Sequence, residues 1–167
     1  MRPRGKHMRI TGMSSLSIPA EAALEQECFS HPWSEESLTD SFNNPASYFF
    51  VAKDDDGNVI GYVGAYMVRD EAFLNNVAVT KSARRQGVGR ALMEKMIETV
   101  SAEGASFLSL EVRFSNQAAA DLYRSLGFEP EGVRKKFYRD PEEDALIMTL
   151  YFETERPFEG GGFEIIK

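Results

Sequence analysis

The chain has 167 residues, 43% of them hydrophobic and 27% charged, and a formal net charge of −7. This length suits one domain with a core of its own, and the single cysteine, Cys28, excludes an intrachain disulfide. The acidity argues against non-specific nucleic-acid binding, and no apolar stretch approaches the ~20 residues of a membrane span. Two histidines and one cysteine cannot form a metal site of the usual spacing. We therefore expect a cytoplasmic protein that uses no metal and binds neither nucleic acid nor membrane.

The two ends of the chain are expected to lie outside the fold. Residues 1–8 form a basic lead, which we exclude from fold reasoning, and a strand is possible over residues 9–13. Residues 153–167 contain three consecutive glycines and are expected to form a C-terminal tail. This leaves residues 9–152 as the folded domain.

The sequence of the first half of the domain predicts two helices and two strands. A helix is expected from Pro19 to about Cys28, and a second from the N-cap Ser34 to near Asn43. Strands rich in β-branched and aromatic residues follow at 48–53 and 59–68, joined by a hairpin loop.

The second half alternates strands and helices and ends in a hairpin. Strands flanking the long helix are expected to be parallel, and those at both ends antiparallel, which indicates a mixed α/β sheet. The expected elements are a strand at 73–79, a helix to about Ala102, a strand at 107–112, a short helix capped by Ser115 or Asn116 and ending at Gly127, and strands at 133–138 and 145–152.

The turn between the strand at 73–79 and the long helix is suited to bind an anion. Gly87 and Gly89 allow the backbone to approach a ligand at the start of a helix, where N–H groups have no internal partner. Arg84, Arg85 and Arg90 add positive charge that matches phosphate oxygens. The sequence is not a Walker loop, because no Gly-Lys-Ser/Thr is present. Alternatively, the loop is a sharp turn that caps the helix.

The spacing Arg84-x-x-Gly87-x-Gly89 resembles the pyrophosphate loop of the GNAT acetyltransferases, where it binds acetyl-CoA. Further segments resemble the RimI-type enzymes of that superfamily, in the order found in the family. They are residues 29–35, 75–79, 110–119, 122–128 and 135–148. The resemblance implies a GNAT fold over residues 9–152: a mixed, mostly antiparallel sheet with splayed central parallel strands, flanked by helices.

The resemblance also implies roles for individual residues. It assigns the general base to Glu111 and the proton donor for the departing thiolate to Tyr123. From the residues alone, Glu111 can instead pair with Arg113 at a strand edge, Tyr123 can be a core aromatic, and Asn116 can be a plain N-cap. The residues expected to bind acetyl-CoA are Val77, Ala78, Val79, Arg84, Arg85, Gln86, Gly87, Val88, Gly89, Arg90 and Asn116.

The function implied is transfer of acetyl from acetyl-CoA to the α-amino group of an N-terminal alanine, in a small-subunit ribosomal protein that is basic. Trp33, Tyr138 and the acidic residues 142–144 are candidates for the peptide groove, although loop anchoring and solvation explain them equally well. Two alternatives remain open: a GNAT enzyme acting on lysine or a small-molecule amine, and a CoA-binding module without turnover.

Overall fold

A computed structural model of the chain describes residues 7–153. Most of the expected lead (1–8) and tail (153–167) lies outside the described residues. Within residues 7–153, no helix combines the length and the apolar character needed to cross a membrane.

One seven-stranded sheet organises the described residues, with the strand order β1-β2-β3-β4-β5-β7-β6. All neighbouring strands are antiparallel except β4 and β5, which are parallel. The mixed, mostly antiparallel sheet predicted from the sequence is therefore confirmed. The strands are β1 (Arg9–Gly12), β2 (Ser47–Lys53), β3 (Val59–Val68), β4 (Glu71–Val79), β5 (Phe107–Arg113), β6 (Glu129–Tyr138) and β7 (Glu143–Tyr151).

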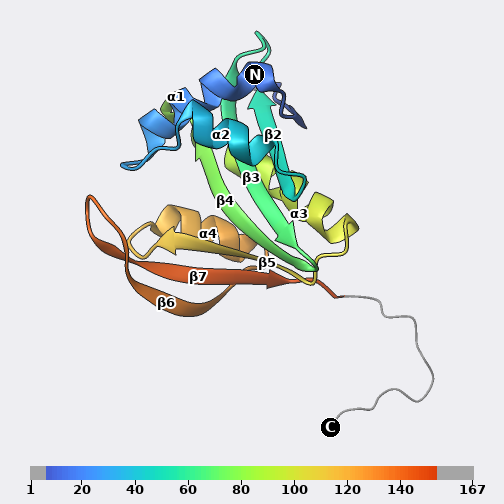
Figure 1. Cartoon of the computed structure of the whole chain (residues 1–167). Helices are drawn as coiled ribbons and strands as arrows, with labels where there is room; N and C mark the ends of the chain where they lie inside the picture. The colour runs from blue at the N-terminus through green and yellow to red at the C-terminus, as the bar shows by residue number, and fades with distance from the viewer. Residues whose placement is uncertain (1–6, 154–167) are drawn as a thin grey trace, which may run out of the picture.

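Helices cover both faces of this sheet (Figure 1). On one face lie α1 (Ile18–Cys28) and α2 (Glu35–Phe42), which pack on β2, β3 and β4. On the other lie α3 (Val88–Ala102) and α4 (Gln117–Ser125). Short 3₁₀ turns at Ser15–Ser17 and Lys81–Ala83 precede α1 and α3.

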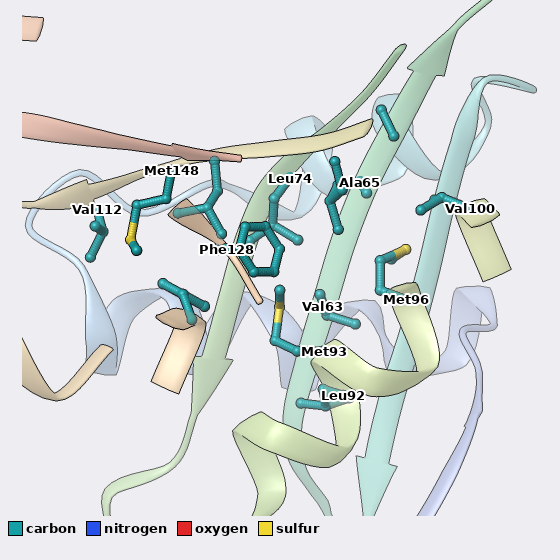
Figure 2. Close-up of a cluster of buried hydrophobic side chains, with 14 of the residues drawn as sticks. Val63, Ala65, Leu74, Leu92, Met93, Met96, Val100, Val112, Phe128 and Met148 are labelled. Carbon is teal, nitrogen blue, oxygen red and sulfur yellow. The ribbon is translucent and has the colours of Figure 1, made fainter. Parts of the chain in front are cut away.

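The larger apolar core lies between the sheet and the face covered by α3. Figure 2 shows Met93 of α3 beside Phe128, which directly precedes β6, and Leu74 of β4. Through these contacts α3 packs against both segments. The side chains of Leu92, Met93 and Met96 are fully buried, as the stripe along this helix requires. A second core under α1 and α2 contains Leu24, Leu38 and Tyr62, among others.

Most element boundaries agree with the sequence prediction, and the largest difference is in β6. This strand begins at Glu129 rather than at Val133. It is an edge strand in which nearly every residue is exposed, so the alternation of buried and exposed residues that marks other strands is missing. Asn116, rather than Ser115, caps α4, and its side chain accepts a hydrogen bond from the Ala119 N–H.

The two parallel strands remain paired over only part of their length. Pairing joins Glu71–Phe73 to Phe107–Ser109 and then stops, although both strands continue. Figure 1 shows β4 and β5 meeting at one end and diverging toward the other. Within β4, Gly64 of β3 pairs with Asn76 and Ala65 with Leu74, so Asn75 is an extra residue that forms a β-bulge. The splayed central strands expected from the sequence are therefore present.

Candidate active site

A cleft of about 1240 Å³ opens where β4 and β5 diverge. β4 and β5 contribute two of its walls, which include Val77 and Val79 on one side and Glu111 on the other. The remaining walls come from the loop before α3, from α4, from the loop after α1 and from the turn between β6 and β7.

The glycine loop leaves the start of α3 open to this cleft. Gly87 is the N-cap and adopts a left-handed conformation with φ of 82°, which a side chain would strain. No side chain caps the helix, so its first N–H groups have no side-chain acceptor. Gly87, Val88 and Gly89 all line the cleft.

Gly89 has no structural reason to be a glycine. A Cβ added there would lie 3.7 Å from Leu122 Cδ2 and 3.8 Å from Val79 Cγ2, which are ordinary contacts. Its φ is not positive, because it lies inside the first turn of α3. A requirement for close approach by a ligand explains this glycine, whereas helix capping alone does not.

The three arginines of the loop line the cleft but differ in their partners. Arg84 Nε donates to the Val79 carbonyl at 3.1 Å, and Arg90 Nη2 donates to Ser125 Oγ at 2.5 Å. Arg85 forms no ion pair or hydrogen bond through its side chain within residues 7–153. Gln86 donates to the Ser82 carbonyl, and its side chain is not part of the cleft wall.

The backbone of β4 alternates between its neighbour and the cleft. The Thr80 N–H donates to the Ile60 carbonyl on the β3 side, so the N–H and C=O of Val79 point the opposite way. By the same alternation the backbone groups of Val77 also point away from β3. Ala78 pairs with Tyr62 of β3, is almost fully buried and does not line the cleft.

Glu111 reaches the cleft from β5, with 30% of its side chain exposed. Its Oε1 lies 3.3 Å from Nε of Arg134, on β6. The pairing with Arg113 considered in the sequence analysis is therefore wrong. Arg113 instead lies 3.4 Å from Glu143, and its guanidinium lies 4.5 Å from the centre of the Tyr138 ring.

Tyr123 lies on α4, in the opposite wall from β4. Its side chain is 5% exposed, and its ring lies 5.8 Å from that of Phe128. Burial, and to a lesser extent Tyr138, raises the pKa of Tyr123 above its usual range, so the hydroxyl is neutral at any working pH. Within residues 7–153 this hydroxyl has no hydrogen-bond partner. Tyr123 is thus both a core aromatic and a residue of the cleft wall.

The sequence was compared with those of known proteins. The profile of the Acetyltransferase (GNAT) family matches residues 19–128. The chain is 38% identical over 143 residues to the ribosomal protein bS18-alanine N-acetyltransferase of Escherichia coli (strain K12), covering 84% of this chain and 95% of that protein. The chain belongs to the GNAT acetyltransferase family.

Two further comparisons agree with this assignment. The ribosomal protein bS18-alanine N-acetyltransferase of Salmonella typhimurium is 37% identical over 144 residues, covering 84% of this chain and 95% of that protein. The crystal structure of the ribosomal-protein-S18-alanine N-acetyltransferase from Escherichia coli superposes with a TM-score of 0.82 at 34% identity, covering 95% of this chain and all of that one. The GNAT fold and the RimI-type relationship predicted from the sequence are therefore confirmed, and the chain is an acetyl-CoA-dependent N-acetyltransferase.

At the other end of this GNAT cleft, two loops meet. Ser30 Oγ donates to the Arg139 carbonyl at 3.2 Å, and His31 Nε2 lies 2.7 Å from Asp140 Oδ2. Trp33 and Tyr138 line the same end, as the sequence suggested for a peptide groove.

The acidic hairpin does not line this cleft. Glu143 accepts from the Ser115 N–H and pairs with Arg113, while Asp144 accepts from the Lys136 N–H. These two carboxylates therefore stabilise the hairpin, which is the loop-anchoring alternative of the sequence analysis.

The sequence analysis missed the ion-pair partner of Glu111 and one residue of the cleft wall. Arg134 was missed because it lies on an edge strand whose register is not readable from periodicity. Glu25 lines the cleft from α1 and is completely buried. Its sequence signal was available: Glu21 and Glu25 are spaced by one helical turn on the face that carries Ile18 and Leu24.

Proposed function

We propose that this enzyme transfers acetyl from acetyl-CoA to the α-amino group of an N-terminal alanine, in a small-subunit ribosomal protein. The observation that carries the proposal is the presence of Glu111 and Tyr123 in one cleft that also receives the open start of α3. The relatives named as ribosomal protein bS18-alanine N-acetyltransferases align over most of both chains, which supports the same substrate class here.

In this proposal the loop from Arg84 to Arg90 binds the diphosphate of acetyl-CoA. Helix N–H groups and Arg85 offer positive charge at the point where Gly89 permits close approach. The pantetheine arm pairs with the outward backbone groups of Val77 and Val79, as an added strand would. Asn116, at the start of α4, lies within reach of the cofactor from the facing wall.

The amine attacks the thioester directly, without an acyl-enzyme. An α-amino group has a pKa of about 7.7–8.0, so much of it still carries an extra proton at neutral pH. Glu111 accepts this proton, directly or through water, and the nitrogen loses a second proton to water once the C–N bond has formed. When the new C–N bond forms, the thioester carbonyl oxygen becomes an oxyanion. The N–H of Val79, which points into the cleft, stabilises it.

Collapse of this intermediate breaks the C–S bond and releases the CoA thiolate. Tyr123 donates its proton to the sulfur and regains one from solvent. The Tyr123 ring is buried and packs against that of Phe128, which holds the hydroxyl in one position and limits the reorientation required during the reaction.

The substrate is proposed to be basic beyond its first residue. The net charge of −7 favours approach of a cationic partner, and ribosomal proteins are usually basic. The proposal also assigns the enzyme to the cytoplasm, where ribosomal proteins are synthesised.

Mass spectrometry of protein N-termini tests the proposal in cells. Comparison of cells with and without this protein should reveal loss of acetylation at the N-terminal alanine of one or a few basic ribosomal proteins. Unchanged ribosomal N-termini, together with loss of acetyl groups from lysines or a small molecule, would contradict it.

A further inference from the structure

Glu25 is a completely buried carboxylate to which the acetyl-transfer chemistry gives no role. Its Oε1 accepts from the backbone N–H of Trp33 at 2.9 Å, and its Oε2 accepts from the Tyr62 hydroxyl at 2.8 Å. Asn76 Nδ2 lies 3.3 Å from both oxygens. A buried carboxylate is costly unless donors surround it, and three separate segments supply these donors.

The neighbouring Glu21 indicates which carboxyl carries the charge. It is also completely buried, one turn earlier in α1, and receives one hydrogen bond, from Ser17 at 3.2 Å. Its Oε1 has no partner within the described residues. Burial raises the pKa of both carboxyls, and that of Glu21 reaches about 7. Because two adjacent buried carboxylates repel each other, below about pH 7 the proton resides on Glu21, and Glu25, with more donors, is the charged member.

The donors of Glu25 lie partly in the cleft wall and partly in the core. Trp33 and Asn76 both line the cleft, one in the loop after α1 and the other directly after the β4 bulge. Tyr62 does not line the cleft and lies in the core beneath α1 and α2. Glu25 therefore joins the Trp33 loop to β4 at the wall of the cleft and anchors both to the core.

We propose that Glu25 is a positioning residue that fixes the peptide end of the cleft, by holding the Trp33 loop against Asn76 of β4. The inference rests on the proposed peptide acetylation for its kinetic consequence, whereas the loop contact itself is independent of it. The loop from Phe29 to Ser34 carries the Ser30 and His31 contacts to the β6–β7 turn. When Glu25 releases Trp33, both sides of this end lose their fixed spacing, while the phosphate loop is unaffected.

Variants that remove different hydrogen bonds of this network separate the positioning of the Trp33 loop from the stability of the fold. Glu25→Leu removes every acceptor, and Glu25→Gln leaves one acceptor oxygen for the three donors. Tyr62→Phe is the matched control, because it removes the Tyr62 hydroxyl, which contacts Glu25 and Asn76, and leaves the bonds from Trp33 and Asn76 to Glu25 in place. Losing the buried hydrogen bond from the Tyr62 hydroxyl is expected to lower stability without freeing the loop.

Trp33 is the only tryptophan of the chain, so its fluorescence reports on this loop directly. We expect at least twofold stronger acrylamide quenching and a lower anisotropy in both Glu25 variants, and wild-type values in Tyr62→Phe. With an Ala-initiated peptide, KM should rise tenfold or more in Glu25→Leu and less in Glu25→Gln. The Kd of acetyl-CoA by calorimetry should remain within twofold of wild type.

The results distinguish a positioning role of Glu25 from a role in stability alone. Unchanged Trp33 quenching in the Glu25 variants would overturn the proposal, as would a peptide KM in Tyr62→Phe that rises as much as in Glu25→Leu. If Glu25→Leu does not fold, Glu25→Gln alone carries the comparison. A wild-type enzyme that acetylates no peptide would refute the proposed function, but the quenching result would still test the link between Glu25 and the loop.

Discussion

Arg134 reaches over β7 from the edge strand and sets its Nε 3.3 Å from Oε1 of Glu111, the proposed base. The Arg134 side chain is 57% exposed, so the pair contributes less than about 1 kcal/mol to stability. The contact makes Arg134 a matched control for Glu111, because each variant breaks the same ion pair.

Glu111→Gln should reduce turnover by about 10²–10⁴, because it removes the proton acceptor and retains the side-chain shape. Arg134→Met breaks the same pair but leaves the carboxylate, so we expect less than a tenfold loss. Steady-state kinetics across pH checks this, with the smallest loss for Glu111→Gln at high pH, where more amine is already neutral. Equal losses of turnover in both variants would mean that Glu111 acts only through its ion pair with Arg134 and is not the base.

Tyr123→Phe should slow turnover by about 10², with the fold intact. The ring fills its site against Phe128 in both proteins, and the hydroxyl has no hydrogen-bond partner within residues 7–153 to lose. Single-turnover kinetics and thermal unfolding are to be measured on the same samples. A variant with wild-type rates would exclude the hydroxyl from the mechanism and leave Tyr123 as a core aromatic.

Gly89→Ala separates ligand binding from folding in the loop before α3. The added Cβ meets only ordinary contacts at 3.7 and 3.8 Å, so stability should change by less than about 1 kcal/mol. Acetyl-CoA affinity should nevertheless fall at least tenfold, and Gly89→Asp should abolish binding by adding like charge. Gly87→Ala is the contrasting variant, because its φ of 82° predicts a loss of stability of about 1–2 kcal/mol.

Calorimetry with acetyl-CoA measures the binding side of this comparison. Unchanged affinity in both Gly89 variants would mean that the loop only caps α3, and the assignment of residues 84–90 to the diphosphate would be withdrawn.

Glu21 should make stability depend on pH. Burial, with a smaller contribution from Glu25, raises the pKa of Glu21 from 4.5 to about 7. Between these values the folded protein keeps a proton that the unfolded chain releases, so this stabilisation is complete below pH 4.5 and is lost as pH rises through 7. The loss amounts to roughly 3 kcal/mol at most.

Urea unfolding at pH 5.5 and 8.5 measures this effect. Glu21→Gln should lose less stability than wild type between the two values, because its side chain does not titrate. Glu98→Gln, on the exposed side of α3, should behave as wild type. If Glu21→Gln retains the wild-type difference, another group is responsible for it.

The sequence predicted the elements of the fold well where burial produces a pattern. The strand at 59–68 and the N-cap at Ser34 agree with the structure because each depends on local residues. β6 was shortened in the prediction because an exposed edge strand has no alternation to read. The motifs identified Glu111 and Tyr123 as candidates, and both lie in the cleft.

Contacts between distant segments were not predictable in the same way. Arg134 approaches Glu111 only because β7 is inserted between β5 and β6 in the sheet. Glu25 meets Asn76 across 51 positions of sequence and through a bulge whose register no periodicity reveals. Such polar networks depend on tertiary packing, so a sequence pattern marks a buried glutamate but not its partners.

The proposed acceptor of the acetyl group is a peptide α-amino group. Two basic peptides that begin with Ala and contain one internal lysine, one with a free terminus and one with a pre-acetylated terminus, distinguish this acceptor from a lysine side chain. We expect rapid CoA release with the free peptide, an acetyl group located on its terminal nitrogen by mass spectrometry, and a rate at least 10²-fold lower with the blocked peptide. Equal rates with both peptides, and acetyl on the lysine, would contradict it and identify a lysine acetyltransferase.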